Sequence, residues 1–262
     1  RDSYGRRRYE ISLDSTLLDI IGECFFGRSL SEKVKKEGHL LAHSAKAGFY
    51  WRSDMIELRH VTKVMKKNVV LDDVSVTFHE GTVYGLYGEN GSGKTMLLRA
   101  VSGLIVPTEG EILCDGKKLH KDISFPENTG IVIENMELLP RFTAKENLRM
   151  LAGIKKIATE EDIERALCDV GLDPKSEKKV KKFSLGMKQR LNIAQAVFEK
   201  QDVILLDEPT NALDVGGVSQ IYDLIRKEKV RGALVIIATH HREDLKEMCD
   251  VILKISGRLL PE

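Results

Sequence analysis

The chain has 262 residues, and its 41 basic and 40 acidic side chains leave a formal net charge of +1. This length holds one large domain or two small ones, and the balanced charge excludes a strong overall field that would attract nucleic acid. The sequence contains no run of about 18 apolar residues, the length that a membrane-spanning helix needs. We therefore expect the chain to act at a membrane only through the spans of another protein.

Cysteine usage limits the chemistry further. The four cysteines, Cys24, Cys114, Cys168 and Cys249, have neither the spacing of zinc ligands nor that of a disulfide framework. The N-terminal residues do not show the pattern of a secretory signal peptide either. These features predict free thiols in a reducing, cytosolic setting.

The first 54 residues differ from the rest of the chain. They include a basic cluster at residues 6–8, which we expect to be solvated rather than bound to acidic lipid, and two patterns typical of amphipathic helices over residues 15–26 and 31–49. Met55 is the first methionine, and the recognisable domain starts directly after it. We expect residues 1–54 to be a fused or mis-started segment; a functional extension that docks a partner is the alternative.

Strands dominate the chain after Met55. Apolar and polar residues alternate over residues 56–61 and 69–78, which predicts two strands. A third strand is predicted over residues 111–114, after which Asp115-Gly116 favours a tight turn. Residues 130–133 form a short apolar run that indicates another buried strand.

Helices are predicted in the next part of the chain. Thr143 and Glu146 form a capping box that begins one helix. Thr159 begins a second helix, which ends near Gly171, and a third is predicted over residues 183–200.

Two later apolar runs, over residues 203–206 and 234–237, are typical of buried parallel strands. The helical pattern over residues 218–229 lies between them, as a right-handed crossover between parallel strands requires. The order strand, helix, strand predicts an α/β fold with a mainly parallel core sheet.

The most informative segment is Gly-Glu-Asn-Gly-Ser-Gly-Lys-Thr at residues 88–95, which matches the phosphate-binding pattern G-x-x-x-x-G-K-[ST] at every position. Its glycines let successive N–H groups point at one anion, and the helix that follows adds its positive N-terminal end. We expect Lys94 to reach the β- and γ-phosphates of a nucleotide and Thr95 to hold Mg²⁺; a chance glycine-rich turn is the alternative. The residues predicted to contact the nucleotide here are Gly88, Asn90, Gly91, Ser92, Gly93, Lys94, Thr95 and Met96.

A second group of candidate residues follows the apolar run at 203–206. Asp207 is expected at the carboxyl edge of the sheet, where it can bind Mg²⁺ directly or through water. Glu208 is expected to orient and deprotonate the attacking water, and Pro209 ends the strand. The alternative is a strand that ends in two solvated acids.

Phe183-Ser-Leu-Gly-Met-Lys-Gln-Arg190 resembles the signature of the ATP-binding cassette (ABC) ATPase family, which is usually Leu-Ser-Gly-Gly-Gln. Ser184 and Gly186 keep the pattern, whereas Leu185 and Met187 depart from it. The variant is similar to that of ATPase subunits in bacitracin- and lantibiotic-export-type transporters. A serine hydroxyl, a glycine N–H and a helix N-terminus can form a second anion site, offered to the nucleotide that another subunit holds.

The resemblance implies roles for further residues. Asp214 ends the D-loop that lies across the dimer interface, and His240 is the switch histidine that contacts the γ-phosphate, while His241 is expected at a helix start. Glu134 lies where most relatives have the Q-loop glutamine, and its carboxylate can bind Mg²⁺ or a water on it. Met65 replaces the aromatic A-loop residue that stacks on adenine, so that base selectivity is expected to be loose.

The resemblance covers residues 55–262 and implies one ABC nucleotide-binding domain. The expected fold is that of a P-loop NTPase, with a mainly parallel core sheet, an antiparallel β subdomain and an inserted α-helical subdomain at about residues 135–185. ATP and Mg²⁺ are the implied cofactors. The residues implied to be catalytic are Lys94, Glu208 and His240.

We therefore predict an ATP-hydrolysing subunit of an ABC transporter, an exporter of peptide or antibiotic type that a separate integral-membrane permease holds at the inner face of the membrane. Each ATP is expected between the Lys94 loop of one subunit and residues 184–186 of a second, identical or paralogous, subunit; no nucleic-acid partner is expected. Two alternatives remain. One is a soluble ABC ATPase that remodels a protein or nucleic-acid complex. The other is a P-loop small-molecule kinase, which would give Ser184 and the Asp207-Glu208 pair no role.

Overall fold

A computed structural model describes residues 55–133 and 137–261 of the chain. Glu134 and the two helices predicted within residues 1–54 lie outside these described residues.

The first of two sheets is antiparallel and has the strand order β2-β1-β4-β5. Strands β1 (Ile56–Met65) and β2 (Asn68–Phe78) form a hairpin in which Ile56 pairs with Phe78. Lys66 and Lys67, the two turn residues, both have left-handed φ values, 46° and 73°, as a type I′ hairpin turn requires. The predicted strands are confirmed, and β1 continues past its predicted end because this turn keeps the two strands paired.

The second sheet has the order β10-β9-β3-β8-β7-β6. Its strands are parallel except for the edge strand β10, which is antiparallel to β9. Every residue of β7 (Val203–Asp207) and β8 (Leu234–Thr239) is buried, which explains their continuous apolar runs, because helices or the other sheet cover both faces. Helix α7 (Val215–Val230) connects them, as the crossover pattern predicted. The other strands of the two sheets are β3 (Val83–Tyr87), β4 (Glu109–Cys114), β5 (Lys117–Lys118), β6 (Thr129–Val132), β9 (Val251–Ser256) and β10 (Arg258–Pro261).

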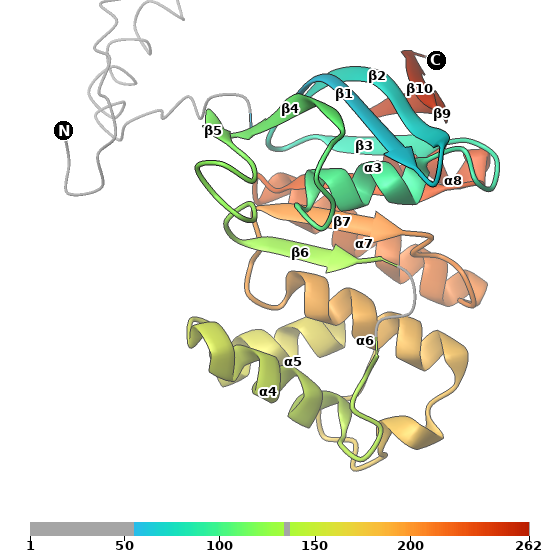
Figure 1. The fold of residues 1–262 in the computed structure, drawn as a ribbon. Coiled ribbons are helices and arrows are strands. Elements are labelled where there is room, and N and C mark those ends of the chain that lie inside the picture. The colour runs from blue at the N-terminus through green and yellow to red at the C-terminus, as the bar shows by residue number, and fades with distance from the viewer. Residues whose placement is uncertain (1–54, 134–136, 262) are drawn as a thin grey trace, which may run out of the picture. The chain divides into compact units, whose positions relative to one another are not determined.

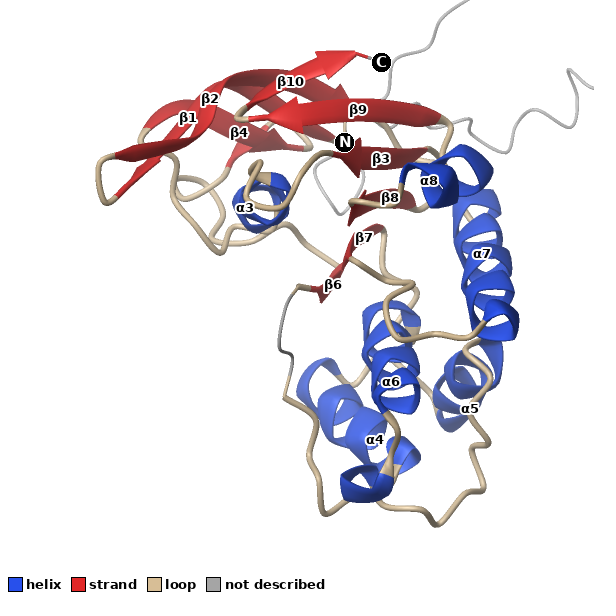
Figure 2. Cartoon of the chain, turned by 90° about the vertical axis from the view of Figure 1, so that its right-hand side faces the viewer, coloured by secondary structure: helices blue, strands red, loops and turns tan. Residues whose placement is uncertain are grey.

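Each face of the parallel sheet packs into a different core. Val203 and Leu205 of β7 join the core that contains helix α3 (Lys94–Val101) and the antiparallel sheet. Their neighbours Ile204 and Leu206 join the core formed with helices of the second half of the chain. Figures 1 and 2 show α3 between the two sheets, with α4, α5 and α6 on the opposite side of β6 and β7.

The helical subdomain contains α4 (Ala144–Lys155) and α5 (Glu160–Asp169). Capping boxes begin both helices, at Thr143 and at Thr159. The helix predicted over residues 183–200 is shorter, α6 (Leu185–Val197), because Ser184 is its N-cap. The remaining helical segments are η1 (Val180–Lys182) and α8 (Arg242–Met248).

Two further findings concern sequence expectations. None of the helices in the described part of the chain is both long enough and apolar enough to cross a membrane. Cys114, Cys168 and Cys249 are free thiols, as predicted. Burial raises the pKa of both Cys114 and Cys249 to about 12, so that these two thiols stay protonated and unreactive near neutral pH.

Candidate nucleotide-binding site

The glycine-rich loop lies between β3 and α3, as predicted, and the space around Gly88 and Gly93 leaves no room for a side chain. A Cβ at Gly93, whose φ is 105°, would lie 2.6 Å from the carbonyl oxygen of Val70 in β2. A Cβ at Gly88 would lie 2.6 Å from Ser92 Oγ and would also overlap the backbone of Ile255 in β9. The loop is therefore packed against strands of both sheets at these two glycines.

Lys94 lies inside the curve of this loop. Its side chain is buried, and Nζ donates hydrogen bonds to the carbonyl oxygens of Gly88 at 2.6 Å and Glu89 at 3.0 Å. An ammonium has three donors, so that one remains for a phosphate oxygen. Ser92 Oγ is buried without a hydrogen-bond partner among the described residues. Buried polar atoms normally have a partner, and an anion in the loop would provide one.

Thr95 and Asp207 bring two oxygens together at the start of α3. Thr95 Oγ1 donates a hydrogen bond to Asp207 Oδ2 at 2.6 Å, and Asp207 is buried at the carboxyl end of β7. Hydroxyl and carboxylate oxygens are the ligands that Mg²⁺ prefers, and Mg²⁺ usually keeps several waters and phosphate oxygens as its other ligands. The donor set therefore fits this cation with only two protein ligands from the described residues.

The carboxylate of Glu208 accepts three hydrogen bonds from the end of β8. The donors are Thr239 Oγ1 at 2.7 Å, the amide N of His240 at 3.1 Å and His240 Nδ1 at 2.7 Å. Since an ionised carboxylate only accepts hydrogen bonds, the last contact requires a proton on Nδ1. The sequence predicted Glu208 and His240 as separate site residues, and the structure places them in direct contact.

The backbone of Glu208 is also constrained. Its φ is 48°, a left-handed value that costs free energy for a residue with a side chain. Two contacts hold it there: its amide N donates to Ala238 O at 2.8 Å, and Gln189 Nε2 donates to the carbonyl oxygen of Glu208 at 3.2 Å. Sequence reasoning missed both Thr239 and Gln189. The signals were available, since Thr239 directly precedes His240 and Gln189 lies within the signature-like segment.

A cavity of about 680 Å³ lies against the loop, Asp207 and Glu208, whereas Thr239 and His240 are not among the described residues that line it. This volume is within the range of pockets that hold small molecules. Besides the loop, Asp207 and Glu208, the cavity is lined by residues from β2, α6 and the segment before α7. The lining residues that were not predicted from the sequence are Val70, Arg99, Val132, Ile133, Gln189, Asn192 and Asn211.

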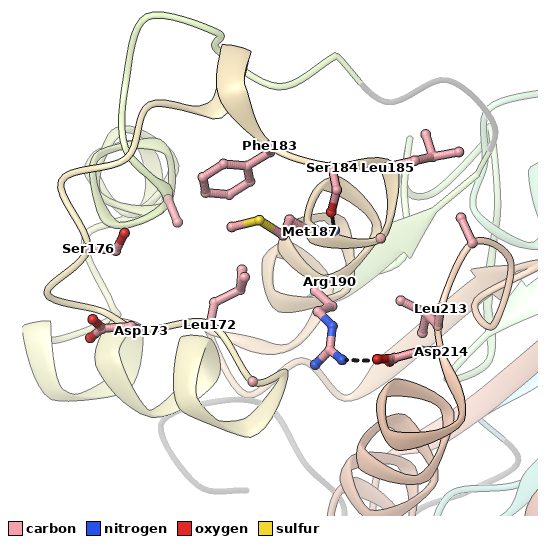
Figure 3. Close-up of a pocket in the computed structure, with 14 residues that line it drawn as sticks. Leu172, Asp173, Ser176, Phe183, Ser184, Leu185, Met187, Arg190, Leu213 and Asp214 are labelled. Carbon is pink, nitrogen blue, oxygen red and sulfur yellow. Dashed lines mark hydrogen bonds and ion pairs between the residues drawn. The ribbon is translucent and has the colours of Figure 1, made fainter.

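Ser184, Gly186 and Asp214 lie elsewhere, around a second cavity of about 670 Å³ (Figure 3). Ser184 Oγ accepts a hydrogen bond from Met187 N at 3.2 Å as the N-cap of α6, and Asp214 Oδ1 accepts one from Gly217 N at 2.9 Å as the N-cap of α7. The predicted nucleotide contacts of the described residues therefore fall into two separate groups within one chain.

Two remaining expectations concern Met65 and His241. Met65 ends β1 and is 42% exposed, and it is not among the described residues that line the Lys94 cavity. His241 is the N-cap residue of α8, as predicted, and its ring lies 3.9 Å from that of His240, centroid to centroid.

Comparison with known proteins agrees with this geometry. A family model described as ABC transporter matches residues 71–211. The ABC transporter ATP-binding protein YybJ of Bacillus subtilis (strain 168) is 59% identical over 206 residues, which are 78% of this chain and 94% of that protein. The bacitracin transport ATP-binding protein BcrA of Bacillus licheniformis is 35% identical, with 80% of this chain and 70% of that protein covered. The lantibiotic transport ATP-binding protein SrtF of Streptococcus pyogenes is 31% identical, with coverage of 76% and 85%.

Solved structures support the same assignment. The dimeric structure of MJ0796, a bacterial ABC transporter cassette, matches with a TM-score of 0.70 and 28% identity, over 78% of this chain and 96% of that one. A dimeric structure of the same cassette in a post-hydrolysis state, bound to ADP and Pi, has a TM-score of 0.70 and 27% identity, over the same 78% and 96%. The resemblance in the sequence is thus confirmed. This chain belongs to the ABC transporter family, as an ATP-binding and ATP-hydrolysing subunit.

Proposed function

We propose that this chain powers an exporter of peptide or antibiotic type, by hydrolysing ATP at a site that two subunits form together. The observation that carries the composite site is the division of the predicted contacts between two cavities. One contains Lys94, Thr95, Asp207 and Glu208, and the other contains the Ser184 and Asp214 helix caps. If two chains face each other head to tail, the Lys94 cavity of each chain would lie against the Ser184 cavity of the other.

In this proposal the first half-site binds the triphosphate. The backbone N–H groups of the loop and Lys94 would hold the phosphates, while Thr95, Asp207 and Glu134 would hold Mg²⁺. Bound Mg²⁺ neutralises charge on the transferring phosphoryl group. The second half-site would add the Ser184 hydroxyl and the N-terminus of α6 from the other subunit.

Glu208 and His240 would carry out the proton chemistry. Glu208 would accept a proton from the attacking water, and the hydrogen bonds from Thr239 and His240 would fix the direction of its carboxylate. His240 is 40% exposed at its side chain. While Nδ1 donates to Glu208, Nε2 would donate to a γ-phosphate oxygen only in the imidazolium form, in which both ring nitrogens carry a proton. Closure of two subunits excludes water from the site and completes it, so that hydrolysis depends on dimerisation.

A mixing experiment tests the composite site. Lys94→Ala removes the phosphate ligand of one half-site, and Ser184→Arg blocks the other, so that each variant alone should be inactive. Mixed in equal amounts, they should recover up to about a quarter of the wild-type ATPase rate, because half of the two-fold dimers are mixed and each of these has one intact site of two. No recovery from two folded, dimeric variants would refute the proposal.

A second experiment addresses Glu208. The wild-type rate per subunit should fall on dilution, and Glu208→Gln should lower kcat by at least about 100-fold, the usual contribution of a general base. Glu243→Gln is a matched control, because Glu243 is 82% exposed at its side chain and its ion pair is with Lys246 of the same helix. A rate per subunit independent of dilution, or full activity of Glu208→Gln, contradicts the reasoning.

The exporter assignment rests on the signature variant and on the names of BcrA and SrtF. A permease partner would place the chain at the inner face of the cell membrane. The chain should therefore co-purify with a polytopic membrane protein. Cells that express both should tolerate more of a membrane-active peptide antibiotic than cells with the Glu208→Gln variant. Retention in a protein or nucleic-acid complex without a membrane protein would favour a remodelling ATPase instead.

A further inference from the structure

Arg190, in the first half of α6, joins three segments of the chain. Its Nη1 donates hydrogen bonds to Val170 O, at the end of α5, at 2.7 Å and to Gln220 Oε1 on α7. Its Nη2 lies 3.4 Å from Asp214 Oδ1 (Figure 3). The Arg190 side chain is only 15% exposed, whereas that of Asp214 is 83% exposed. A largely buried guanidinium therefore connects α5, α6 and the start of α7.

Two glycines leave the room that this guanidinium occupies. A Cβ at Gly217 would lie 2.6 Å from Arg190 Nη2 and 2.8 Å from Asp214 Oδ1. A Cβ at Gly171 would overlap Arg190 Nη1 and the Gln220 side chain. Gly216, the neighbour of Gly217 on α7, has no atom of the described chain within 4 Å of such a Cβ. A methyl group at Gly217 would thus displace the guanidinium of Arg190 or the carboxylate of Asp214, whereas one at Gly216 would touch neither.

The segments that Arg190 joins also touch directly. A Cβ at Gly186 would lie 2.7 Å from the carbonyl oxygen of Ala212, two residues before Asp214. The start of α6 therefore packs against the segment before α7, and Arg190 and Asp214 form a polar contact between the same two parts of the chain. Among the described residues, Arg190 lines the cavity of Ser184 and Asp214 and is not part of the lining of the Lys94 cavity.

We propose that Arg190 is a positioning residue for ATP hydrolysis, which holds Ser184, Gly186 and Asp214 in one arrangement for the nucleotide of the other subunit. This inference rests on the proposed composite site. A planar guanidinium can donate to a carbonyl, an amide and a carboxylate at once, in fixed directions, whereas the ammonium of lysine cannot reproduce this fork. Arg190 acts through the residues it holds and does not itself touch the ATP of its own chain.

Substitution of Arg190 should separate binding from turnover. Arg190→Ala and Arg190→Lys should keep the wild-type dissociation constant for ATP in dilute protein, where each chain uses only its own Lys94 cavity. Their kcat should fall by about 10- to 100-fold, the usual effect of misplacing a reacting group by about 1 Å. Arg226→Ala is the control, because Arg226 is exposed and its ion pair is with Asp223 of the same helix.

The sharper test moves Arg190 without replacing it. Gly217→Ala and Gly216→Ala add the same methyl group to α7 and favour the helix alike, but only the first displaces the guanidinium. Gly217→Ala should lower kcat at least about 10-fold with ATP binding in dilute protein unchanged, and Gly216→Ala should match the wild type in both.

Equal kcat for the two glycine variants would overturn the inference. So would a full rate for Arg190→Lys, or a loss of ATP binding in proportion to kcat, which is the result of a merely structural role. The composite site itself is tested separately, with the wild type alone. If that site were wrong, the wild-type rate per subunit would not change on dilution.

Discussion

Thr239→Val is the substitution that tests most directly how Glu208 is held. Thr239 is 1% exposed; its Oγ1 donates to Glu208 Oε2 at 2.7 Å and accepts from His241 N at 3.1 Å. Valine keeps the shape of threonine and has a methyl group in place of the hydroxyl. Glu208 would retain its two contacts with His240. Its carboxylate could rotate, however, because the hydrogen bond from Thr239 Oγ1 to Oε2 would be missing.

The expected loss follows from this hydrogen bond. A hydrogen bond to a charged group contributes about 1.5–3 kcal/mol, and about 1.4 kcal/mol of transition-state stabilisation corresponds to tenfold in rate. If the bond is needed in the transition state, kcat should fall about 10- to 150-fold, with little change in the dissociation constant for ATP. The amide of His241 also loses an acceptor, so that the unfolding temperature should fall by a few degrees, at about 2–4 °C per kcal/mol for a domain of this size.

The assay is phosphate release at saturating ATP, well below the unfolding temperature of the variant. Thr129→Val is the matched control, because Thr129, the first residue of β6, donates a hydrogen bond from Oγ1 to the carbonyl oxygen of Pro126, outside the site. A Thr239→Val variant that hydrolyses ATP at the wild-type rate, although its unfolding temperature has fallen, would refute the positioning of Glu208 by this hydroxyl.

Three further predictions concern the base, the helical subdomain and the cation. Met65→Trp should lower the dissociation constant for ATP about 5- to 150-fold, because stacking on an aromatic ring contributes about 1–3 kcal/mol per base; equilibrium titration measures this constant, and an unchanged value would contradict contact between residue 65 and the base. Burial alone would raise the pKa of Asp162. Hydrogen bonds from Thr159, Lys200 and Arg165 outweigh the effect of burial and hold the pKa well below its usual range. Its stabilisation is therefore present above the ordinary carboxyl pKa and is lost as the pH falls below about 4; thermal unfolding of Asp162→Asn should depend less on pH in that range, and an unchanged dependence would contradict this. Removing Mg²⁺ with a chelator should abolish phosphate release, which added Mg²⁺ should restore in the wild type and not in Asp207→Asn; hydrolysis in excess chelator would refute the role of Thr95 and Asp207.

The sequence by itself determined the features that depend on neighbours along the chain. Residues 88–95 need only their own glycines and the following helix to make an anion site. The capping box at Thr143 consists of two hydrogen bonds with Glu146, three positions along the chain. The apolar runs of β7 and β8 report burial on both faces wherever the strands lie. The resemblance of residues 183–190 to a family signature then predicted the family.

Only the tertiary structure decided which of these local features meet. Glu208 and His240 are in contact because β7 and β8 are neighbouring parallel strands, with Asp207 opposite Ala238. Arg190 reaches Val170, Gln220 and Asp214 because three helices converge on it, and no periodicity in the sequence reports such a convergence. Local propensity acts over a few residues of chain, whereas the direction of a side chain in a site depends on packing between segments far apart in sequence.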